Sequence, residues 1–296
     1  MASLYTQQSR NVFRTWTLMG VFLAVVIAVG WILSLYFNDT SLLYIAVGFS
    51  LISNVGAYWF SDKVAIASVG AKPADETTYK ELHRIVENLS ITAGLPKPRV
   101  YIIEDAQPNA FATGRDKEHA VIAVTTGLLG MMERSELEGV LAHELAHIGN
   151  RDILVMTVAV VLVGFISVIA NIALRMSMFG GDRDRDRNPV ILIAALVAMI
   201  LAPIAAQLIQ LAISRKREFL ADASGALLTR YPDGLAAALQ KIGSYARPMT
   251  RASTTTAHLF ISNPFGAHPA GQWVAKLFST HPPMEERIAA LRGLEV

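Results

Sequence analysis

Two histidines four residues apart, His143 and His147, have the spacing in this chain that most clearly indicates chemistry. They belong to the stretch His143-Glu144-Leu145-Ala146-His147. Residues four apart lie on one face of an α-helix, so both imidazoles can be directed at one metal ion. Glu144 projects beside them, where it can act as the general base of a metallopeptidase. The alternative is a pair of surface histidines on an ordinary helix.

A zinc peptidase also needs a third protein ligand and an open fourth position for water. Glu218 can supply the ligand, and Asp222, four residues later on the same helical face, can fix the tautomer of a ligating histidine. The chain has no cysteine, so any metal is held by nitrogen and oxygen, a ligand set that suits zinc. The alternative for this pair is the solvated start of a helix. We expect one Zn²⁺ per chain, held by His143, His147 and Glu218.

The composition is typical of an integral membrane protein. Hydrophobic residues make up 53% of the chain and charged residues 17%. A net charge of +2 gives no reason to expect nucleic acid as a partner. Runs long enough to cross the hydrocarbon core of a bilayer, which needs about 20 helical residues, cover 15–37, 41–60, 153–174 and 190–213. We expect four transmembrane helices in two hairpins, although the third and fourth runs could instead be buried core helices.

The remaining residues form a catalytic domain that the second hairpin interrupts. We expect four units: a transmembrane hairpin at 1–60, the first part of the catalytic domain at 61–152, a second hairpin at 153–213, and the second part, with Glu218, at 214–296. Within 61–152, helical and then β-rich patterns predict a helix, a small antiparallel sheet and the helix of the metal motif. The predicted fold class is α+β, mostly helical.

With these motifs the chain resembles the HtpX-like membrane metallopeptidases, relatives of the CAAX prenyl proteases and the mitochondrial Oma-type proteases. Besides the two amino-terminal spans, the resemblance rests on four segments, 108–114, 143–152, 217–222 and 279–283. It implies a zincin-like fold and a multi-pass location in the bacterial cytoplasmic (inner) membrane. It also implies a role in quality control, with unfolded or membrane-embedded protein substrates and other membrane quality-control proteases as partners.

For such a peptidase, zinc would lower the pKa of its water and polarise the scissile carbonyl, while Glu144 would take the water's proton. The segment Asn109-Ala110-Phe111 looks like the edge strand that holds an extended substrate through backbone pairing, and an interior strand is the alternative. Candidates for stabilising the oxyanion are His281, Arg217 and Tyr245. For His281, which two prolines follow, we favour a structural role in a rigid turn.

The distribution of positive charge predicts the orientation in the membrane. Arg10 and Arg14 precede the first span, and Lys63 and Lys72 follow the second, so the amino terminus and the metal motif are expected in the cytoplasm. Because two helices must reach one ion, the number of crossings between them must be even, and a hairpin at 153–213 satisfies this. Four arginines between residues 175 and 187 disagree, since they would prefer the cytoplasm. The alternative is that these segments do not cross.

Two other classes of protein compete with this hypothesis. In an intramembrane metalloprotease the histidine pair would lie inside a span, but the four charges in 132–138 disfavour a helix that starts in hydrocarbon. In a membrane scaffold, receptor or transporter the pair would be incidental, and function would not depend on Glu144.

Overall fold

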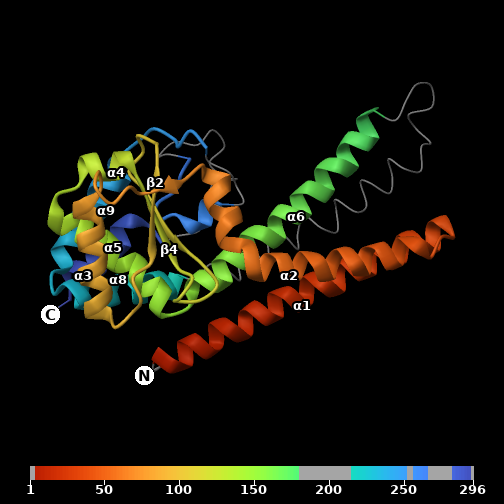
Figure 1. The fold of residues 1–296 in the computed structure, drawn as a ribbon, viewed down its shortest axis with the longest axis horizontal. Helices are drawn as coiled ribbons and strands as arrows, with labels where there is room; N and C mark the ends of the chain where they lie inside the picture. Colours follow the sequence, from red (N-terminus) through yellow and green to blue (C-terminus); the bar gives the residue numbers. More distant parts are fainter. Residues whose placement is uncertain (1–3, 180–214, 252–255, 266–281, 295–296) are drawn as a thin grey trace.

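Long helices extend from one side of the molecule, and shorter helices with a small sheet form the rest (Figure 1). The structure, a computed structural model, describes residues 4–179, 215–251, 256–265 and 282–294. Its helices are α1 (Leu4–Phe37), α2 (Ser41–Val69), α3 (Lys80–Ala93), α4 (Thr126–Met131), α5 (Arg134–Gly149), α6 (Asp152–Phe179), α8 (Arg215–Thr229), α9 (Pro232–Ser244), the 3₁₀ helix η1 (Ala257–Leu259) and α11 (Met284–Arg292). Its strands are β1 (Lys72–Pro73), β2 (Arg99–Ile103), β3 (Ala110–Thr113) and β4 (Val121–Thr125).

The helices α1 and α2 form a hairpin, and both are long and apolar enough to cross a membrane. Exposed aromatic side chains lie toward both ends of α1, including Trp16 and Tyr36. At 1.5 Å per residue these two are about 30 Å apart along the axis, which matches the hydrocarbon thickness of a bilayer. Trp59 of α2 is also exposed, and Tyr58 beside it stacks on Trp16. Trp and Tyr favour the membrane interfaces, so this spacing is compatible with a hairpin that spans a bilayer.

The third predicted span begins in α6, which follows α5 after a sharp bend. The two helices meet at 82°, with only Asn150 and Arg151 between them, and Arg151 adopts a φ of 58°. The first turns of α6 are buried against α1 and α2. Among the described residues, therefore, two helices qualify as spans by themselves, and the bent pair α5–α6 would be a third. The fourth predicted span, 190–213, lies outside the described residues, so four transmembrane helices are not confirmed.

The sheet is mixed, so the predicted antiparallel sheet is wrong. Its strand order is β1-β2-β4-β3, with β2 parallel to β4 and the other pairs antiparallel. A parallel pair needs a crossover connection, and here the chain passes through β3 before it returns as β4. The turn after β3 depends on Gly114, whose φ is 138° and whose added Cβ would lie 2.6 Å from the carbonyl oxygen of His119. In this strand order β3 occupies an edge of the sheet.

The helix α5 lies at the centre of the part of the molecule that contains the sheet. It packs against α3, α8, α9 and β3, and most of its residues are buried. Apolar side chains of α5, such as Val140, Leu141 and Leu145, belong to one core that also contains residues of the sheet, α9 and α11. Four polar residues of α5 are buried, Glu136, His143, Glu144 and His147, and each needs a specific partner.

Candidate metal centre

Three side chains able to bind a metal meet between α5 and α8. His143 and His147 come from α5 and Glu218 from the first turn of α8, and one ligand atom from each lies within 4.8 Å of the others. The two Nε2 atoms are 3.1 Å apart. The Glu218 carboxylate lies 3.8 Å from Nε2 of His143 and 3.6 Å from Nε2 of His147. Nitrogen and oxygen donors bind zinc at about 2.0–2.2 Å, so this spacing fits one ion.

The close approach of α8 to α5 depends on Gly225. A Cβ at this position would lie 2.9 Å from the backbone nitrogen of His143, a distance that real side chains do not reach. Glycine therefore lets the two backbones come close enough for Glu218 to reach both imidazoles. This contact cannot be predicted from the sequence, because a glycine within a helix gives no indication of which residue it packs against.

Each histidine is held by a carboxylate on its other ring nitrogen. Nδ1 of His143 lies 2.9 Å from Oδ1 of Asp222, as the predicted orienting role requires. Nδ1 of His147 lies 3.0 Å from Oδ2 of Asp152, the first residue of α6. Both carboxylates are buried. Such partners direct Nε2 toward a metal and make the ring a stronger ligand. The role of Asp152 was missed because it lies beyond the end of α5, where helical periodicity no longer applies.

Arg287 of α11 is a further member of the site that the sequence analysis missed. It is fully buried and donates from Nε and Nη2 to the two oxygens of Asp222, at 2.8 and 2.6 Å. Its Nη1 lies 3.7 Å from Glu218. Burial by itself would lower the pKa of Arg287, but the charge of Asp222 outweighs it and raises the pKa. One signal was available: Arg287 shares a helical face with Met284 and Leu291.

The electrostatics of the two histidines differ. Burial lowers the pKa of His143 to about 4. Burial also acts to lower the pKa of His147, but the hydrogen bond with Asp152 and the charge of Glu218 outweigh it and raise the pKa to about 9. Without a metal, His147 therefore carries the proton at neutral pH, and its Nε2 donates to Nε2 of His143. That proton would lie between the two Nε2 atoms.

Glu144 is buried beside these ligands. Burial raises its pKa to about 7, while the nearby charge of His147 and the backbone amide of Ala112 act in the opposite direction. Ala112 belongs to β3, so the edge strand and Glu144 are in contact. A carboxylate whose pKa lies near neutrality is suited to accept a proton in one step and return it in the next.

Comparison with known proteins identifies the family. The sequence profile of peptidase family M48 matches residues 76–295. The chain belongs to this family. It is 49% identical to a protease HtpX homolog of Caldanaerobacter subterraneus over 99% of each chain, and 48% identical to one of Pyrococcus furiosus over 95% of each. The crystal structure of S. mikatae Ste24p superposes with a TM-score of 0.51 at 19% identity, over 97% of this chain and 67% of that one, which shows a shared fold. This M48 peptidase is thus a membrane-associated metalloprotease.

Asn109, Ala110 and Phe111, which were predicted to bind the substrate, contact residues 260–262 of the M48 peptidase. The amide of Asn109 bonds to backbone groups of Ser262, and Phe111 is fully buried against Phe260 at 5.1 Å. The carbonyl of Ala110 accepts a hydrogen bond from Ile261. The side chains of Asn109 and Phe111 thus anchor β3 within the protein.

The three candidates for the oxyanion site lie in different places. Arg217 is buried and directed at Asp152, with Nε 3.5 Å from its carboxylate. Tyr245 directly follows the end of α9. His281 lies outside the described residues. None of these positions assigns an oxyanion role.

Proposed function

We propose that this chain is a zinc-dependent endopeptidase that cleaves misfolded or damaged membrane proteins at the cytoplasmic face of a bacterial inner membrane. The observation that carries the proposal is the convergence of His143, His147 and Glu218 on one point, with Glu144 buried beside them. Family membership supports a metal and protein substrates. The donor set of two imidazoles and one carboxylate, with no cysteine, favours zinc.

In this proposal the residues of the chain divide the work. Zinc, held by His143, His147 and Glu218, supplies Lewis-acid chemistry that makes water nucleophilic at neutral pH and polarises the substrate carbonyl. Glu144 takes the proton of the attacking water and delivers it to the departing amine. The amide of Ala112 supports the ionised form of Glu144, since it donates to the carboxylate. Asp222 and Asp152 keep both imidazoles directed at the ion.

The substrate would bind as an extended strand beside β3. This strand lies at the edge of the sheet, and its Ala112 end touches Glu144. At the Ala110 end, the carbonyl of Ala110 already accepts a hydrogen bond from the backbone amide of Ile261. We therefore place the substrate along the Ala112 end, close to the general base. Backbone pairing accepts many sequences, which suits an enzyme that acts on unfolded proteins.

The proposed topology places the catalytic domain on the cytoplasmic side. The catalytic domain consists of residues 61–152 and 214–296, and the transmembrane hairpins are residues 1–60 and 153–213. The positive residues around α1 and α2 support this orientation. The shared metal site supports only that both parts of this domain lie on one side of the bilayer, because helices that share one ion cannot be separated by it. Other quality-control proteases of the same membrane are the partners we propose.

Replacement of the general base tests the mechanism. The full chain is purified in detergent, its zinc content is measured, and cleavage of unfolded casein is followed for the wild type and for Glu144→Gln. We expect the rate to fall by about 10²–10⁴-fold, the usual contribution of general-base catalysis, with zinc retained. The matched control is Glu138→Gln, since Glu138 lies on the same helix and pairs with Arg134 rather than with the ligands. Equal cleavage by Glu144→Gln and wild type would refute the mechanism.

A further inference from the structure

The beginning of α1 lies against the residues around the candidate metal site. Asn11 is five residues before Trp16, about 7.5 Å farther along the axis of α1. It is only 1% exposed. A buried amide costs free energy unless it is hydrogen-bonded, and the partners of the Asn11 side-chain amide are Asn150, Asp152 and Arg217.

The amide of Asn11 bonds to the carboxylate that holds a metal ligand. Its Nδ2 donates to Oδ1 of Asp152 at 2.6 Å and to the backbone carbonyl of Asn150 at 3.0 Å. The other oxygen of Asp152 lies 3.0 Å from Nδ1 of His147. The three side chains thus form a continuous buried chain from the first membrane helix to Nε2 of His147.

We propose that Asn11 is a positioning residue for the metal centre, which holds Asp152 in the rotamer that orients His147 and so couples the seating of α1 to the affinity for the metal. The inference rests on the proposed function, because it takes His147 as a ligand. The terminal torsion of an aspartate is broad, so a carboxylate bonded on one oxygen alone is free to turn. Arg217 also approaches Oδ1 of Asp152, but at 3.5 Å its hold is weaker than that of Asn11 at 2.6 Å.

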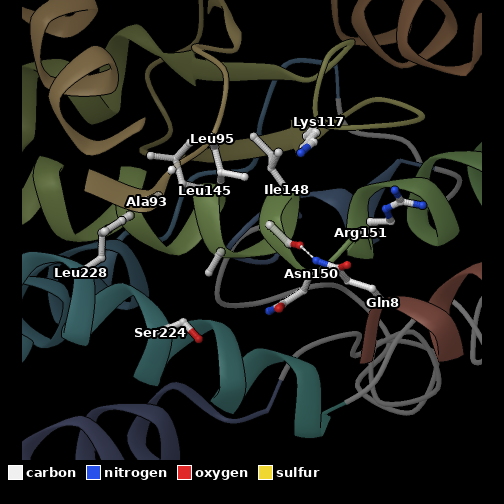
Figure 2. Close-up of a pocket in the computed structure, with 14 residues that line it drawn as sticks. Gln8, Ala93, Leu95, Lys117, Leu145, Ile148, Asn150, Arg151, Ser224 and Leu228 are labelled. Carbon is white, nitrogen blue, oxygen red and sulfur yellow. Dashed lines mark hydrogen bonds between the residues drawn. The ribbon is translucent and has the colours of Figure 1, made fainter. Parts of the chain in front are cut away.

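A neighbouring residue provides a control for simple docking of α1. Gln8 lies one turn before Asn11 and donates to the carbonyl of Gly149 at 2.8 Å, the bond drawn in Figure 2. It therefore ties α1 to the end of α5, as Asn11 does, but it does not contact Asp152. A cavity of about 540 Å³ lies beside this contact and is lined by Gln8, Asn150 and Ser224 among others (Figure 2).

The test measures metal affinity in the full chain in detergent. The Kd for Zn²⁺ is determined by competition with a chromophoric chelator for wild type, Asn11→Ala, Gln8→Ala, Asp152→Ala and the double variant Asn11→Ala/Asp152→Ala. Loss of an outer partner of a ligand lowers metal affinity by about 10–100-fold, so we expect about tenfold weaker binding for Asn11→Ala. We expect wild-type affinity for Gln8→Ala. In the Asp152→Ala background, Asn11→Ala should add nothing, since Asn11 acts through that carboxylate.

The absorption bands of the Co²⁺-loaded chain give a second readout. They should change in Asn11→Ala and remain as in wild type in Gln8→Ala, because a docking defect alone does not alter the ligand geometry. If Asn11→Ala fails to fold, Asn11→Ser replaces it, with a hydroxyl that keeps one donor and an expected affinity between those of wild type and Asp152→Ala.

Three outcomes would overturn the inference alone: wild-type affinity in the Asn11 variant, an equal loss in Gln8→Ala, or full additivity with Asp152→Ala. A wild-type chain that binds no zinc would instead refute the proposed function, and this inference with it.

Discussion

Arg287 and Asp222 form a bidentate ion pair in the interior of the catalytic domain, with both hydrogen bonds at 2.8 Å or less. Asp222 in turn holds His143. Through this pair the last described helix, α11, is part of the metal centre although it supplies no ligand. The guanidinium also lies near Glu218, so it compensates two buried carboxylates at once.

Removal of this guanidinium should destabilise the metal-free chain. For Arg287→Leu we expect a loss of about 3–5 kcal/mol in the free energy of unfolding, since the variant leaves buried carboxylates without their partner. Arg292→Leu on the same helix is the control, because Arg292 is exposed and its guanidinium bonds to Gln240 rather than to a buried carboxylate. Denaturant unfolding in detergent measures both. Equal stability of the two variants would contradict the assigned role.

The substitution Gly225→Ala should separate α5 from α8, the two helices that carry the predicted metal ligands. Its carbon would lie 2.9 Å from the nitrogen of His143, so Gly225→Ala must move α8 away from α5 and Glu218 with it. We expect a loss of about 1–3 kcal/mol in stability, the usual cost of overpacking, together with weaker zinc binding. Gly130→Ala, where the methyl group meets no atom within 4 Å, should leave zinc binding unchanged. Wild-type zinc affinity in Gly225→Ala would show that the contact is not needed.

Zinc binding should release a proton from His147. The raised pKa of about 9 means that the metal-free site holds this proton at pH 7, whereas the lowered pKa of His143, about 4, means that His143 contributes none. A ligand must be deprotonated to bind, so affinity should rise by about tenfold per pH unit from pH 7 toward 9 and then level off. Calorimetry in two buffers of different ionisation enthalpy counts the released protons. A constant affinity between pH 7 and 8 would contradict the expectation.

The orientation of the amino-terminal hairpin can be tested by labelling single cysteines, because the natural chain contains none. We expect Asp39→Cys, in the turn between α1 and α2, to react with an impermeant maleimide on intact spheroplasts. Lys72→Cys, after α2, should react only after lysis. The reversed pattern would place the catalytic domain outside the cytoplasm. A corresponding cysteine at Ser177 tests whether the chain after α6 reaches the outer side.

Local patterns in the sequence predicted the three side chains that meet between α5 and α8, and long-range contacts explain what was missed. His143 with His147 and Glu218 with Asp222 are pairs at helical spacing, so each pair could be recognised alone. Asn11 lies more than a hundred residues from Asp152, on a helix whose apolar pattern assigns it to the membrane. Arg287 follows two acidic residues that make its helix look solvated. The strands were recognisable from their β-rich residues, but this pattern does not determine which strands become neighbours, and the parallel pairing of β2 with β4 was therefore not anticipated.

The sharp bend between α5 and α6 has a consequence for the choice of substrate. Only two residues separate the helix that carries both histidines from the helix that runs toward the bilayer. In the proposed topology the metal site would therefore lie at a fixed height above the lipid. An extended chain covers about 3.3–3.6 Å per residue, so a short loop between two spans would not reach the site, whereas a long unfolded segment would.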